Sequence, residues 1–86
     1  MPLFPIAANT LAALRSVDAG PEHVVRTVVY VVSADQAVLA QVWQRFLASP
    51  LAAAFTTAST LLGVAQLDFT GQLVELDVTA ALPEAS

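Results

Sequence analysis

The sequence contains no cysteine, a single histidine and only three basic residues among its 86 positions. Without cysteine there is no disulfide, no thiol nucleophile and no thiolate metal site, and one histidine does not form a metal site alone, so no metal is expected. The basic residues Arg15, Arg26 and Arg45 are scattered along a chain of net charge −4. Binding to nucleic acid or to an anionic membrane surface needs clustered basic residues, so neither is expected as a partner.

Charged residues make up only 12% of the chain, whereas 57% of its residues are hydrophobic. A chain of this length forms one small domain, taken here as residues 1–86, and such a domain cannot bury that much apolar surface by itself. The excess is expected on the surface as an apolar patch, and large patches of this kind mark interfaces. The composition therefore predicts an oligomer, or a fragment that has lost its packing partners.

The longest uncharged stretch covers residues 46–67 and reads FLASPLAAAFTTASTLLGVAQL. Its length would suit a membrane span, but Pro50 would break a helix near its start, and the Thr, Ser and Gly residues that follow favour a strand. We interpret it as the end of a helix, a turn at Ser49-Pro50 and a long buried strand within residues 53–67. The N-terminus lacks the basic region of a signal peptide, so the expected location is the cytoplasm.

The first half of the chain predicts two helices on either side of one strand. Apolar residues recur at helical spacing over residues 6–17, and Gly20-Pro21 is expected to end this helix. The segment 23–32, HVVRTVVYVV, is typical of a strand that is buried on both faces. A second helix follows, and Ser33 with Gln36 matches the S-x-x-Q capping box at its start.

The last part of the chain predicts one more strand. Residues 68–72 form a turn in which Gly71 supplies a positive φ. Residues 73–80 then alternate, with Glu75 and Asp77 on the side opposite Val74, Leu76 and Val78. A short loop between two strands predicts an antiparallel hairpin, and the strand–helix–strand unit before it predicts a parallel crossover. The sum is an α+β sandwich in which two helices cover one face of a mixed β-sheet.

Four segments together resemble the RidA/YjgF family of reactive-intermediate deaminases. They are AGPEHVVRTVVYVV (19–32), AVLAQVWQRFLAS (37–49), ASTLLGVAQL (58–67) and LVELDVTA (73–80). The resemblance implies the chorismate-mutase-like fold, a homotrimer with clefts between the subunits, and hydrolysis of imines and enamines to a keto acid and ammonia without a cofactor. It also implies that the family's opening β-strands are missing, so that this chain is N-terminally truncated relative to the family.

One position departs from the family pattern. The family's deaminases carry a P-A-R-(S/T) motif whose arginine clamps the substrate carboxylate. Aligned on residues 63–65, this motif falls on residues 57–60, and Ser59 takes the arginine position. A serine hydroxyl cannot replace a bidentate cationic fork, so we expect the chain to lack 2-aminoacrylate deaminase activity.

The candidate site residues are Glu75, Ser59 and Thr60. Glu75 matches the family acid that lines the cleft and holds a water, and Asp77 shares its side of the strand; the alternative is a solvated polar face. The hydroxyls of Ser59 and Thr60 could bind a small anion, although local hydrogen bonds to the backbone explain them equally well. His23 is expected to be an exposed loop residue.

Three functions stay open at this point. The first is a RidA-like trimer that binds a small metabolite at its interface clefts without the family deaminase reaction, or that binds nothing. The second is a hydrolase of the same reaction class that acts on an uncharged or differently charged imine or enamine. The third is a fragment with no independent function.

Overall fold

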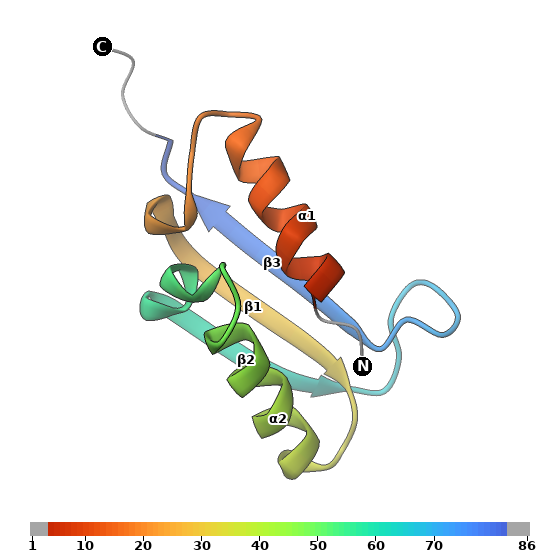
Figure 1. The fold of residues 1–86 in the computed structure, drawn as a ribbon. Coiled ribbons are helices and arrows are strands. Elements are labelled where there is room, and N and C mark those ends of the chain that lie inside the picture. Colours follow the sequence, from red (N-terminus) through yellow and green to blue (C-terminus); the bar gives the residue numbers. More distant parts are fainter. Residues whose placement is uncertain (1–3, 83–86) are drawn as a thin grey trace.

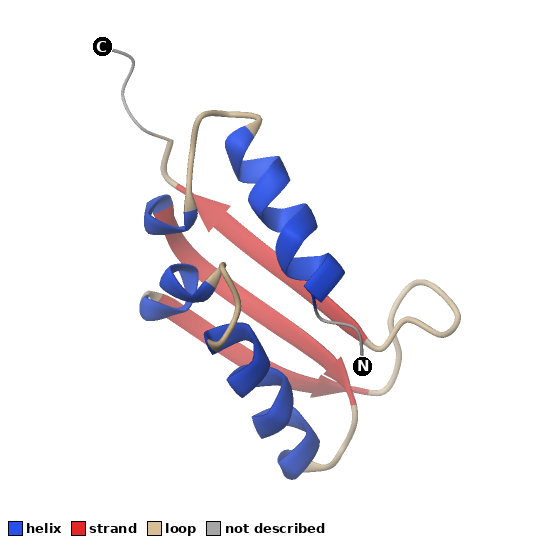
Figure 2. Cartoon of the chain, in the orientation of Figure 1, coloured by secondary structure: helices blue, strands red, loops and turns tan. Residues whose placement is uncertain are grey.

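A three-stranded mixed sheet with helices on one face forms the architecture, in a computed structural model that describes residues 4–82 (Figure 1). The elements are α1 (Phe4–Arg15), η1 (Pro21–His23), β1 (Val24–Val32), α2 (Gln36–Leu47), η2 (Ala52–Thr56), β2 (Ala58–Val64) and β3 (Val74–Ala80). The strand order is β2-β1-β3, with β2 parallel and β3 antiparallel to β1. Both helices lie on the same side of the sheet (Figure 2), which confirms the predicted α+β class and the mixed sheet.

The central strand β1 is buried from both sides, as its Val-rich sequence predicts. Val29 and Val31 are fully buried and belong to the core beneath the helices. Val28 points the other way and is still only 2% exposed. A strand with apolar residues on both faces fits the middle of a sheet, where a neighbour pairs on each edge.

The predicted hairpin between β2 and β3 is wrong. Strand β3 pairs with β1, with Val78 opposite Thr27 and Glu75 opposite Tyr30, so β1 separates β3 from β2. The loop 65–73 crosses the end of the sheet instead of making a tight turn (Figure 1). Neighbours in sequence often pair, but here the fully apolar β1 takes the centre and leaves the half-polar β3 at an edge.

The first helix ends two residues earlier than predicted, and Gly20-Pro21 does not end it. Asp18 adopts a left-handed φ of 57°, the Asp18 N–H donates to Arg15 O (3.1 Å), and the Ala19 N–H donates to Leu14 O (2.9 Å). These two bonds form a Schellman C-cap, a motif in which Asp tolerates the left-handed conformation. Gly20-Pro21 instead opens η1, and Val17 lies outside the helix with 49% of its surface exposed.

The predicted capping box on α2 is also wrong. Asp35 is the N-cap, and its Oδ1 accepts the Ala37 N–H at 2.8 Å. The Ser33 hydroxyl accepts the Asp35 N–H at 3.0 Å, so it fixes the turn before the helix and does not cap it. A carboxylate is an equally good cap, and it carries charge that favours a helix N-terminus.

The uncharged run of residues 46–67 divides into the end of α2, the short helix η2 and strand β2. Its first part fills the core, because Phe46 and Leu51 are fully buried. Phe55 stacks against Phe46 at 5.1 Å and meets Trp43 edge to face at 5.4 Å, which adds specific packing to apolar burial. Within residues 4–82, no helix has the length and apolar character needed to span a membrane.

Candidate functional site

The sheet has one face without helices among the described residues, and we call it the open face. Side chains alternate between the faces along a strand. Val29, Val31 and Leu76 pack into the core with the helices, so the residues between them point away from it. The open face carries Arg26, Val28 and Tyr30 of β1, Thr60 and Leu62 of β2, and Glu75, Asp77 and Thr79 of β3.

Glu75 lies on the open face in a row with two apolar side chains. It is paired with Tyr30 across β1 and β3, and Tyr30 is paired with Leu62 across β1 and β2. Directly opposed antiparallel residues have Cβ atoms about 4.5–5.5 Å apart, so Glu75 and Tyr30 are immediate neighbours. Glu75 is half-buried, and its carboxylate makes no hydrogen bond or ion pair with any residue from 4 to 82. It is therefore available to hold a water or to accept a proton.

Thr60 shares this face, one row along the sheet. It is exposed and is paired with Val28, which is in turn opposite Asp77. The structure thus brings Thr60, Glu75 and Asp77 onto one surface, with β1 between the hydroxyl and the two carboxylates.

Ser59 lies on the opposite side of the sheet. Its hydroxyl accepts a 2.7 Å hydrogen bond from the hydroxyl of Thr27, which is fully buried, and donates to Thr57 O at 3.2 Å. These bonds use the Ser59 hydroxyl inside the fold, in the way that short polar side chains often serve local backbone. Within one chain, Ser59 and Glu75 are not brought together.

His23 is half-buried, not exposed as predicted. Its Nδ1 accepts the Gly20 N–H at 2.9 Å, and its own backbone N–H donates to Gly20 O at 3.0 Å. The Glu22 carboxylate lies 3.5 Å from the same Nδ1. Since an Nδ1 that accepts a hydrogen bond carries no proton to donate, we assign the imidazole to holding the η1 turn and not to an ion pair.

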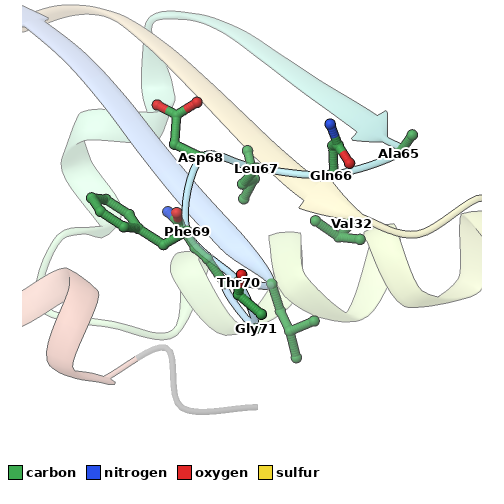
Figure 3. Close-up of a pocket in the computed structure, with 10 residues that line it drawn as sticks. Val32, Ala65, Gln66, Leu67, Asp68, Phe69, Thr70 and Gly71 are labelled. Carbon is green, nitrogen blue, oxygen red and sulfur yellow. The ribbon is translucent and has the colours of Figure 1, made fainter.

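A hollow of about 430 Å³ lies beside the loop between β2 and β3 (Figure 3). It is lined by Val32 and by residues 65–73, and of these Asp68 alone is charged. Gln72 Nε2 donates to Val74 O at 3.3 Å, while Gln72 Oε1 is buried without a hydrogen-bond partner among the described residues. None of the candidate site residues lines this hollow, so it is separate from the open face.

The comparison with known proteins identifies the family. No protein-family model and no curated protein matches the chain. A solved structure does: YyfB from Yersinia pestis, a protein of unknown function of the conserved Rid protein family, is 31% identical over 90% of this chain, with a TM-score of 0.73. The chain belongs to the Rid family. It spans 57% of the length of YyfB, and the matched part contains the whole sheet arrangement described above.

In this Rid-family chain, sequence reasoning overlooked Arg26. This residue is exposed on the open face and is paired with Ala58 on one side and Thr79 on the other. Its parity with Tyr30 along β1 could have placed the two on one face, but the strands that flank β1 could not be derived from sequence. Two rows separate Arg26 from Glu75, and no salt bridge joins Arg26 to either acid of β3 within residues 4–82.

Proposed function

We propose that this Rid-family protein binds a small metabolite in clefts between three copies of the chain, without 2-aminoacrylate deaminase activity. The observation that carries the proposal is the arrangement around Glu75. Its carboxylate has no partner among residues 4–82, and its row contains Tyr30 and Leu62 but no cation. A carboxylate-bearing substrate needs a cationic clamp, and Ser59 at the family's arginine position is neutral and points to the other face.

The open face supports the proposed trimer. Leu62 is 43% exposed at this face, and Val25, just before it on β1, is 50% exposed. A strand as apolar as β1 is normally covered on both sides, and the helices cover only one side here. Three open faces packed around a threefold axis would remove this apolar surface from water and place Glu75 next to a neighbouring subunit.

The first experiment incubates the purified protein with freshly generated 2-aminoacrylate and measures the rate of ammonia release. We expect the rate to equal that of buffer alone and to be the same for Glu75→Gln. Light scattering on the same sample is expected to give the mass of three chains. Accelerated ammonia release that the Glu75→Gln variant abolishes would overturn the loss of activity, and polydisperse aggregate would favour a fragment.

A second candidate function is imine or enamine hydrolysis on a substrate without a carboxylate. The half-buried Glu75 beside Tyr30 favours it, because a partly desolvated carboxylate is suited to proton transfer. Turnover of an uncharged imine, reduced about 10²- to 10⁴-fold in Glu75→Gln, would favour this function over binding alone. Equal rates for the two proteins would exclude Glu75 as the acid–base group.

A further inference from the structure

The charge distribution on the open face defines the kind of ligand that suits it. Its rows run Glu75–Tyr30–Leu62, then Asp77–Val28–Thr60, then Thr79–Arg26–Ala58. The end at Glu75 combines one unpartnered carboxylate with a ring and an aliphatic side chain. The only positive charge on this face in the described residues is Arg26, at the opposite end.

Three properties of the Glu75 row point to an organic cation. A half-buried carboxylate without a partner gains most from a positively charged hydrogen-bond donor. The ring of Tyr30, its direct neighbour in the sheet, is attractive to an ammonium or iminium group placed over its face. Leu62, which is 43% exposed on the other side of Tyr30, offers apolar surface to the rest of such a ligand.

The neighbouring charges strengthen this preference. Asp77 lies one row away on the same face, so it adds negative potential near Glu75. Arg26 would repel a cation at its own end of the sheet, which leaves the end at Glu75 as the favourable position. An anionic ligand meets the reverse situation, since it would lie between two carboxylates and an apolar pair.

We propose that the cleft ligand is an apolar amine or iminium compound without a carboxylate, bound through its nitrogen by Glu75 and Tyr30 and through its apolar part by Leu62. This inference rests on the proposed trimer, because a second subunit is needed to enclose the open face. It differs from a preference for amino-acid-derived imines, whose carboxylate would require the missing clamp.

Two matched probes test this assignment by isothermal titration. The 2-phenylethylammonium ion and 3-phenylpropionate carry the same aromatic group and opposite charges. We expect the ammonium ion to bind at least 10-fold more tightly than the carboxylate, and more weakly as the salt concentration rises. Glu75→Gln should weaken its binding at least 10-fold and Tyr30→Leu several-fold, whereas Glu22→Gln, on the exposed η1 turn, should leave it unchanged.

The outcomes separate this inference from the proposed function. If light scattering shows a trimer but the ammonium ion does not bind, or binds equally well to Glu75→Gln, the ligand class is wrong and the trimer stands. Tighter binding of 3-phenylpropionate that is lost in Arg26→Gln would show that Arg26 anchors an anion, which overturns the inference. A monomer of wild-type protein would overturn both, since the cleft would not exist.

Discussion

At the scale of single residues, the hydroxyl pair of Thr27 and Ser59 explains a serine where the family has an arginine. Thr27 is fully exposed to the core and not to solvent, with 0% of its surface accessible, and Ser59 is its hydrogen-bond partner at 2.7 Å. Ser59→Ala is expected to destabilise the protein by about 1–3 kcal/mol, because it leaves a buried hydroxyl without that partner. Urea denaturation at constant protein concentration measures the change.

Two further variants show whether the hydrogen bond is the cause. The double change Thr27→Val with Ser59→Ala removes both partners, and it should be less destabilising than Ser59→Ala alone. Thr60→Val, on the exposed neighbour that faces the other way, should stay within about 0.5 kcal/mol of wild type. Equal losses for Ser59→Ala and Thr60→Val would contradict this account.

At the scale of elements, Gly63 lets β2 approach the backbone that leaves β1. A Cβ at this position would collide with the carbonyl oxygen of Ser33, which belongs to the backbone and cannot turn away. Gly63→Ala is therefore expected to destabilise the protein by about 1–3 kcal/mol, and Gly63→Asn by more, since the added volume grows. Thermal or urea unfolding of the two variants gives the comparison.

Gly71 provides the contrast, because its requirement is conformational and not steric. Its φ is +82°, and a Cβ there would meet nothing within 4 Å. Asn adopts positive φ more readily than Ala, so Gly71→Asn should be less destabilising than Gly71→Ala. The same order at position 63 as at position 71 would show that crowding against Ser33 is not what selects glycine in β2.

At the scale of the whole molecule, the open face is expected to hold the subunits together. Leu62→Lys places a charge on this face, and we expect it to reduce the mass in light scattering from three chains to one. Val17→Lys adds the same charge at another exposed apolar position, beside the end of α1, and should leave the trimer intact. A Leu62→Lys protein that remains a trimer would direct attention to another surface.

Several features could be predicted from sequence because they depend on neighbours along the chain. The Val-rich segment 24–32 is apolar at both parities, which identifies a covered strand. The alternation from Val74 to Asp77 predicts an outer strand with one polar side, and Gly71 marks a turn with positive φ. The helix caps were harder, because Ser33 and Asp35 are both good N-caps and only the fold decides which one is used.

The sequence alone determined the class of fold, the order of its elements and the family resemblance, since hydrophobic period and turn residues are local properties. Only the tertiary structure decided that β3 pairs with β1, which puts Glu75 beside Tyr30 and in one row with Leu62. It also decided that Ser59 faces the helices while Thr60 faces away from them. The side of a sheet that a residue occupies depends on pairing and on which face the helices cover, and both result from long-range packing that no local pattern specifies.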